Sequence, residues 1–179
     1  MKWRNNVAVA LFAAALCALS PWALPLGAVP VTLGTLGVYL AAALLGLRRG
    51  TAAVGLYLLL GALGVPVFAG FTGGFQQLAG LTGGYLWGYL LCAGVIGLLL
   101  RCSRRPALLP VWLTLGTMAL YAVGTGWYLW QSGGTVGAAL LVCVVPFLPA
   151  DAAKIAVATG LILPLRGRMD RLLKEDVYL

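Results

Sequence analysis

Residues 82–130 read TGGYLWGYLLCAGVIGLLLRCSRRPALLPVWLTLGTMALYAVGTGWYLW, which is two apolar runs separated by three arginines. Each run, 82–100 and 107–130, is close to the roughly 20 apolar residues that a helix needs to cross a membrane. The arginines between them favour a turn in water at the edge of the bilayer. This stretch therefore predicts a helical hairpin whose two arms cross a lipid membrane.

The rest of the chain repeats this pattern. Further apolar segments occupy residues 6–24, 33–47, 51–65 and 135–165, which makes six candidate spans. Loops on the cytoplasmic side of a membrane carry the excess of Lys and Arg. In a six-span arrangement eleven of the twelve basic residues fall on one side: Lys2, Arg4, Arg48, Arg49, Arg101, Arg104, Arg105, Arg166, Arg168, Arg171 and Lys174. The sequence therefore predicts an all-α membrane protein with six transmembrane helices, both termini cytoplasmic, in one domain over residues 1–179.

Composition excludes several other classes. The chain is 62% hydrophobic and 9% charged, whereas a soluble domain carries about 25% charged residues. It is too poor in charge for a soluble enzyme, a disordered tail or a nucleic-acid-binding domain. It contains no histidine and four acidic residues, which argues against histidine-dependent hydrolysis and against a metal site. The net charge of +8 is then a signal of topology and of contact with lipid headgroups.

The first apolar run leaves two questions open. Its basic start and apolar continuation also fit a secretory signal peptide, although Pro21 follows closely on the potential cleavage region. Within the run Ala10, Ala14 and Ala18 recur every four residues, so they form a stripe of small residues on one helix face. Such a stripe serves either internal packing or docking against another membrane protein.

Two connections without Lys or Arg are broken by glycine and proline. They cover residues 21–35 and 61–84 and lie on the non-cytoplasmic side in the six-span arrangement. Irregular backbone at membrane depth is tolerated where protein or water covers it. We expect these segments to form a lid over a ligand, with loops that merely plug the bundle as the alternative.

The segment PFLPADAAK, residues 146–154, carries two charges within an apolar span. Asp151 and Lys154 are three residues apart and share a helix face. Arg166 follows Asp151 by 15 residues, or about 22 Å of helix, which places the pair in the outer half of the membrane. Each such charge costs at least ~2.5 kcal/mol to insert. This cost favours a functional site, and a structural ion pair that sets helix register is the alternative.

The chemistry of this pair indicates what a ligand would look like. Pro149 predicts a helix that restarts just before Asp151, where the helix dipole favours a carboxylate. Asp151 offers an acceptor and Lys154 a donor, which suits a small polar ligand with N–H and carbonyl groups. The apolar part of such a ligand would pack against the nearby aromatic residues Phe68, Phe71, Phe75 and Tyr85.

Three motifs resemble those of the BioY family, the biotin-binding S components of energy-coupling-factor (ECF) vitamin transporters. They are PVTLGTL at residues 30–36, GVPVFAG at 64–70 with GLTGGYL at 80–86, and PFLPADAAK at 146–154. The resemblance implies an ECF S-component-like bundle in the cell membrane that captures biotin from outside. It implies no cofactor and no chemistry on the ligand, with a transmembrane coupling subunit and cytoplasmic ATPase subunits as partners. Inward delivery would follow from toppling of the whole subunit.

The resemblance also assigns residues. It implies that Asp151 accepts from the ureido N–H groups of biotin and that Lys154 donates to a biotin oxygen. By the same resemblance Thr32 belongs to a flexible lid. The resemblance places the remaining expected residues in the pocket wall and on the docking face for the coupling subunit: Thr82, Gly83, Gly84 and Tyr85 in the wall, and Ala10, Ala14 and Ala18 on the docking face.

The chain departs from the family pattern at one lid position and leaves two other functions open. Relatives usually have Gln where Gly34 stands, so a polar lid group is missing here. One other function is an intramembrane enzyme with Asp151 as acid or base and Lys154 as its electrostatic partner. The other is a self-sufficient carrier of another small vitamin.

Overall fold

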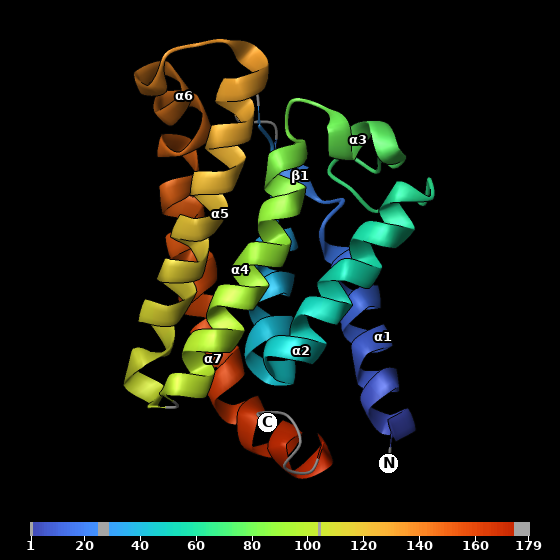
Figure 1. The fold of residues 1–179 in the computed structure, drawn as a ribbon. Coiled ribbons are helices and arrows are strands. Elements are labelled where there is room, and N and C mark those ends of the chain that lie inside the picture. The colour runs from blue at the N-terminus through green and yellow to red at the C-terminus, as the bar shows by residue number, and fades with distance from the viewer. Residues whose placement is uncertain (1, 25–28, 104, 174–179) are drawn as a thin grey trace.

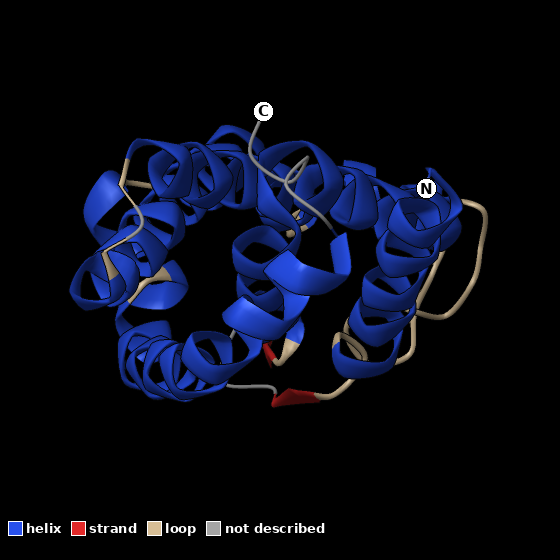
Figure 2. Ribbon diagram, turned by 90° about the horizontal axis from the view of Figure 1, so that it is seen from below, coloured by secondary structure: helices blue, strands red, loops and turns tan. Residues whose placement is uncertain are grey.

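The computed structural model describes residues 2–24, 29–103 and 105–173, and it is helical over most of them (Figures 1 and 2). A pair of two-residue strands lies at one edge of the bundle. The elements in chain order are α1 (Lys2–Leu19), β1 (Ala23–Leu24), β2 (Val31–Thr32), α2 (Gly34–Ala62), α3 (Phe75–Ala79), α4 (Gly83–Cys102), η1 (Pro106–Leu108), α5 (Leu109–Ser132), α6 (Val136–Cys143), η2 (Val145–Phe147) and α7 (Leu148–Leu173).

Helix α4 occupies the middle of the bundle (Figure 1). It packs against α2 on one side and α5 on the other, while α1 packs on α2, and α7 contacts both α2 and α5. The start of α1, the bend of α2, the α4–α5 connection and the end of α7 lie at the same end. These are the segments that carry the arginines, so the structure agrees with the expected clustering of basic residues at one end.

Helix α2 is a hairpin of two helical arms joined at Gly46. Gly46 has φ 76° and ψ −177°, a backbone conformation that glycine adopts at little cost. The arms lie so close that a Cβ on Gly50 would come within 2.8 Å of the carbonyl oxygen of Ala41. The arms correspond to the second and third expected spans, 33–47 and 51–65.

The number of membrane crossings stays a prediction. Four helical segments in the described chain are long and apolar enough to cross a membrane, and α1 is a shorter apolar helix. Counting α1 and each arm of α2 gives the six spans that the charges indicate.

The last expected span, 135–165, is interrupted near Pro149, where the sequence predicted that a helix restarts. Helix α6 ends at Cys143, the turn η2 follows, and α7 begins at Leu148. Pro146 and Pro149 lie at this break, and neither can donate a backbone hydrogen bond. The restart confirms that Asp151 occupies the first turn of a helix.

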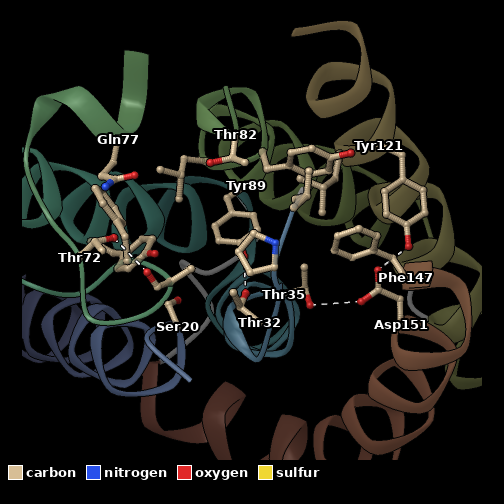
Figure 3. Close-up of a pocket in the computed structure, with 18 of the residues that line it drawn as sticks. Ser20, Thr32, Thr35, Thr72, Gln77, Thr82, Tyr89, Tyr121, Phe147 and Asp151 are labelled. Atoms are coloured by element: carbon tan, nitrogen blue, oxygen red, sulfur yellow. Dashed lines mark hydrogen bonds between the residues drawn. The ribbon is translucent and has the colours of Figure 1, made fainter. Parts of the chain in front are cut away.

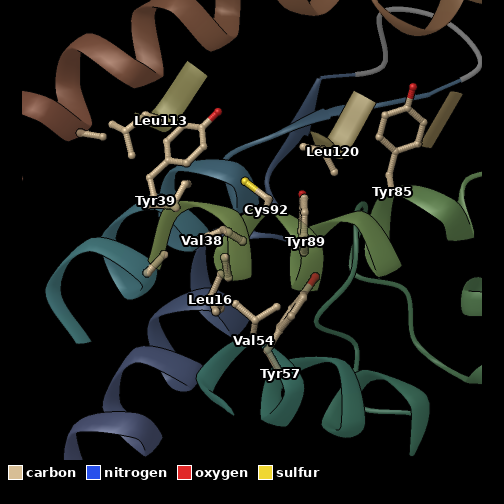
Figure 4. Packing of buried hydrophobic residues seen from close by; sticks show 14 of the residues in the cluster. Leu16, Val38, Tyr39, Val54, Tyr57, Tyr85, Tyr89, Cys92, Leu113 and Leu120 are labelled. Carbon is tan, nitrogen blue, oxygen red and sulfur yellow. The ribbon is translucent and has the colours of Figure 1, made fainter. Parts of the chain in front are cut away.

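The core is made largely of tyrosines and aliphatic residues from α1, α2, α4 and α5 (Figure 4), and α7 adds Ala158 and Ile162. Tyr39 and Tyr57 of α2 are fully buried, as is Leu16 of α1. The Tyr39 hydroxyl forms a hydrogen bond of 2.5 Å with the Thr117 hydroxyl of α5. This bond pairs two polar groups that would otherwise be unsatisfied in an apolar interior. This packing fixes the walls of the cavity described next.

Candidate ligand-binding site

Figure 3 shows the residues around a cavity of the bundle, whose volume is about 170 Å³. The helix ends that line it lie opposite the arginine-rich segments in Figure 1. A water molecule needs about 10–15 Å³ on this measure, so the cavity has room for roughly ten waters or one small organic molecule. Its wall comes from the segment after α1, the lid strand β2, both arms of α2, the loop before α3, and helices α3, α4, α5 and α7. The lining residues are Ser20, Val29, Pro30, Thr32, Thr35, Tyr57, Phe68, Ala69, Thr72, Gln77, Thr82, Tyr85, Leu86, Tyr89, Leu120, Tyr121, Phe147, Asp151 and Lys154.

Asp151 and Lys154 form a buried ion pair in the wall. Lys154 Nζ lies 2.8 Å from Asp151 Oδ1, and their side chains are 9% and 4% exposed. Both lie at the start of α7, where the helix N-terminus stabilises the carboxylate. The pair is therefore clasped, yet it borders an open cavity.

Two further residues complete this polar cluster. Lys154 Nζ donates to Thr35 Oγ1 at 3.0 Å, and Thr35 Oγ1 in turn donates to Asp151 Oδ1 at 3.4 Å. The Tyr121 hydroxyl donates to Asp151 Oδ2 (Figure 3). The carboxylate is thus fixed by groups from α2, α5 and α7.

The cluster still has hydrogen-bonding capacity for a ligand. An ammonium has three N–H donors and a carboxylate about four acceptor positions. Within the described chain Lys154 uses two donors and Asp151 receives three bonds. By this count one donor and one acceptor remain, and a cyclic urea presents a complementary carbonyl and N–H.

The opposite side of the cavity is polar but uncharged. Figure 3 shows Ser20, Thr72 and Gln77 there, well apart from Asp151 and Tyr121. Ser20 is 1% exposed and its hydroxyl has no partner within the described residues. A buried hydroxyl without a partner costs about 1–3 kcal/mol, so a ligand or water that reaches it gains a hydrogen bond.

Aromatic rings make up the wall between these two sides. Phe68 packs edge-on against Tyr57, and Tyr85 stacks on Phe147 with ring centroids 6.1 Å apart. The Tyr85 hydroxyl donates to the carbonyl oxygen of Cys143 at 2.9 Å. Tyr85 therefore presents its ring to the cavity while its hydroxyl holds the end of α6.

A short hairpin covers the cavity. Strands β1 and β2 pair antiparallel, with Ala23 opposite Thr32. The Thr32 hydroxyl pairs with the Tyr89 hydroxyl of α4 at 3.0 Å and accepts from the backbone N–H of Gly34. A Cβ on Gly34 would lie 2.6 Å from Ser20 Oγ. The close fit of this hairpin over α4 therefore depends on glycine at position 34.

Comparison with known proteins identifies the family. The family model for BioY matches residues 1–171.

The chain belongs to the BioY family.

Its relatives include transporters and one solved structure. The biotin transporter BioY of Thermotoga maritima is 42% identical over 156 residues, covering 85% of this chain and 90% of the relative. The biotin transporter BioY of Rhodobacter capsulatus is 41% identical over 178 residues, covering 89% and 90%. A crystal structure of the S-component for biotin from an ECF-type ABC transporter superposes with a TM-score of 0.86 at 28% identity, covering 93% and 92%. The fold of this BioY family member is accordingly that of an ECF S component.

The structure brings together most of the pocket residues expected from sequence. Thr32, Phe68, Thr82, Tyr85, Asp151 and Lys154 all line the cavity. The expectation that Phe71 and Phe75 contact the ligand was wrong, because both are absent from the lining and their side chains are 59% and 68% exposed.

Gly83 and Gly84 are absent from the cavity lining and lie in helix contacts. A Cβ on Gly83 would approach the carbonyl oxygen of Leu78 to 2.1 Å, and one on Gly84 would approach Trp127 Cβ to 2.2 Å. These two glycines thus allow the start of α4 to sit against its neighbours.

The alanine stripe lies away from the pocket. Ala10, Ala14 and Ala18 are exposed on α1, whereas Ala13 and Leu16 face the core. In this BioY family member the stripe therefore does not serve packing within the described part of the bundle.

Sequence reasoning gave no pocket role to Tyr121, Tyr89 or Ser20, and it saw Thr35 only within the lid segment. Thr35 and Tyr121 are separated from Asp151 by 116 and 30 positions, so no local spacing marks them. A tyrosine in the middle of an apolar span was the one available signal for Tyr121 and Tyr89, because interfacial tyrosines lie at span ends.

Proposed function

We propose that this BioY family protein binds biotin in the cavity and delivers it inward as the substrate-binding subunit of an ECF-type transporter. The observation that carries the proposal is the buried Asp151–Lys154 pair beside the cavity. Its remaining donor and acceptor match the ureido edge of biotin. The transporter names of the relatives favour this reading over an enzyme or a carrier of another vitamin.

The rest of the cavity suits the rest of the ligand. The apolar ring system of biotin would pack between Phe68, Tyr85 and Phe147. The β1–β2 hairpin would close over it, held by the bond from Thr32 to Tyr89. Ligand entry from the outer face follows, because the cavity lies opposite the arginine-rich end.

Transport requires partners in this proposal. The exposed stripe of Ala10, Ala14 and Ala18 would dock on a transmembrane coupling subunit, since small residues let helices approach closely. Cytoplasmic ATPase subunits would supply the energy for toppling of the bundle within the cell membrane. No cofactor takes part in this proposal.

Titration of purified protein with biotin tests the proposal. The parent should bind tightly, and Asp151→Asn or Lys154→Met should each lose at least ~2 kcal/mol, about 30-fold in affinity. Thr114→Ala, an exposed threonine of α5, is the control and should bind like the parent. Absence of binding by the parent, or unchanged affinity in both pocket variants, would contradict the proposal.

A further inference from the structure

Within the described chain three buried side-chain atoms have no hydrogen-bond partner: Ser20 Oγ, Arg49 Nη1 and Arg166 Nη2. The serine faces the cavity. The two arginines belong to segments at the opposite, basic end of the bundle (Figure 1). Buried polar groups are nearly always paired, and an unpaired one needs an explanation such as a bound ion.

Arg166 points into the protein from α7. It is 9% exposed, and Ile162 and Met169, at helical spacing on the same face, pack into the core. Arg166 Nη2 has no hydrogen-bond partner within the described residues, and a buried donor of a charged group that stays unpaired is unfavourable. Asp151, the one acidic side chain that the structure describes, lies in the cavity and is engaged there.

Arg49 flanks the same contact from α2. Met169 packs against a cluster of Ala41, Leu45 and Ala53 from the two arms of α2. Arg49 precedes Ala53 by one helical turn, and Arg166 precedes Met169 by nearly one turn. Both arginines therefore lie next to the place where α7 crosses beneath α2.

Depth and chemistry select the ligand class. Arg166 lies about 22 Å along α7 from Asp151, which brings it to the headgroup layer of the arginine-rich side. A planar guanidinium binds phosphate oxygens in a bidentate fashion. Anionic phospholipids are abundant in the cytoplasmic leaflet, and basic pockets between helices on that side bind their headgroups.

We infer that Arg49 and Arg166 form a binding site for a phosphate group, which the headgroup of an anionic phospholipid at this depth supplies. The site is separate from the ligand cavity and joins the bend of α2 to the end of α7. Occupancy would hold these two elements together and give the buried nitrogens of Arg49 and Arg166 hydrogen-bond partners. It would therefore raise the thermal stability of the bundle.

The test measures the unfolding midpoint of the purified full chain in nanodiscs. Nanodiscs of phosphatidylcholine alone are compared with nanodiscs that also contain phosphatidylglycerol, for the parent, Arg166→Gln, Arg49→Gln and the control Arg105→Gln. Arg105 is exposed on the α4–α5 connection at the same end. Phosphatidylglycerol should raise the unfolding midpoint of the parent and of the control Arg105→Gln equally. Arg166→Gln and Arg49→Gln should each lose at least half of that rise.

A second arm distinguishes the source of the phosphate. Inorganic phosphate is added to the detergent-solubilised parent and to Arg166→Gln. If inorganic phosphate raises the unfolding midpoint of the parent but not that of Arg166→Gln, the site binds a soluble anion. If phosphatidylglycerol raises the midpoint of the parent and inorganic phosphate does not, the lipid headgroup is the ligand. An equal lipid effect in all four proteins would overturn the inference, because surface charge alone would then explain it. If neither phosphatidylglycerol nor inorganic phosphate raises the unfolding midpoint of the parent, the inference is also overturned.

Loss of folding must be separated from loss of the site. Biotin affinity serves as the check, since the cavity lies at the other end of the bundle. If Arg166→Gln does not fold, Arg49→Gln is read together with native mass spectrometry of retained lipid. One phosphatidylglycerol retained by the parent and absent from Arg49→Gln would support the site, and equal retention would overturn it.

Discussion

Asp151 receives hydrogen bonds from Thr35, Tyr121 and Lys154, which lie on three different helices. A buried pair of this kind contributes little net stability, because desolvation offsets its attraction. Removing one member is costly, since the other then stays charged and unpaired. The four residues therefore form a rigid polar surface that is ready for a ligand before the ligand arrives.

Tyr121→Phe tests this rigidity at a single atom. The change removes one hydrogen bond to a charged acceptor, worth about 1.5–3 kcal/mol, and leaves the ring in place. We expect biotin affinity to fall by about 10- to 100-fold in calorimetric titration while the fold persists. Tyr128→Phe on the same helix is the control, because the Tyr128 hydroxyl makes no hydrogen bond within the described residues. Equal affinity of both variants and the parent would show that Tyr121 does not position the carboxylate.

At the scale of elements, close contact between α4 and its neighbours sets the shape of the cavity. Gly84 meets Trp127 of α5, and Gly124 of α5 meets the ring of Tyr85. The same interface thus orders one wall of the pocket. The apolar runs and their arginine boundaries were enough to predict these helices.

Two single alanine substitutions in α4 test the contact between Gly84 and Trp127. Gly84→Ala places a methyl group against Trp127 and should destabilise the protein by about 1–3 kcal/mol. Gly94→Ala meets nothing within 4 Å, so the higher helix propensity of alanine should leave stability equal or raise it by up to ~1 kcal/mol. Chemical unfolding monitored by tryptophan fluorescence measures both. A Gly84→Ala variant as stable as Gly94→Ala would refute the close packing.

Local patterns predicted the ends of the elements better than their mutual arrangement. Asp151 and Lys154 were visible because two charges in an apolar span violate a strong rule. Thr35 and Tyr121 were not, because their role depends on packing between helices far apart in sequence. Gly46 resembles any helical glycine in the sequence, and its reversal of the chain depends on contact between the two arms of α2.

At the scale of the whole molecule, the fold predicts which end faces the cytoplasm. Cys102 is exposed beside the arginines of the α4–α5 connection, while Cys92 and Cys143 are buried. In right-side-out membrane vesicles a membrane-impermeant maleimide should therefore label Cys102 after permeabilisation only. On a Cys17→Ser/Cys102→Ser background, which removes the half-buried and the exposed cysteine, Phe75→Cys at the other end should label without permeabilisation, since Phe75 is 68% exposed. Labelling of Cys102 in intact vesicles would contradict the orientation.

The most direct measurement is the rise in thermal unfolding midpoint that biotin produces in the double variant Asp151→Asn/Lys154→Met. Replacing both charges removes the cost of burying them, so the unliganded variant should unfold at the parent's temperature or above it. Biotin should raise the midpoint of the parent by mass action and leave that of the double variant unchanged. A biotin-induced rise in the double variant as large as that of the parent would show that this ion pair is not what holds the ligand.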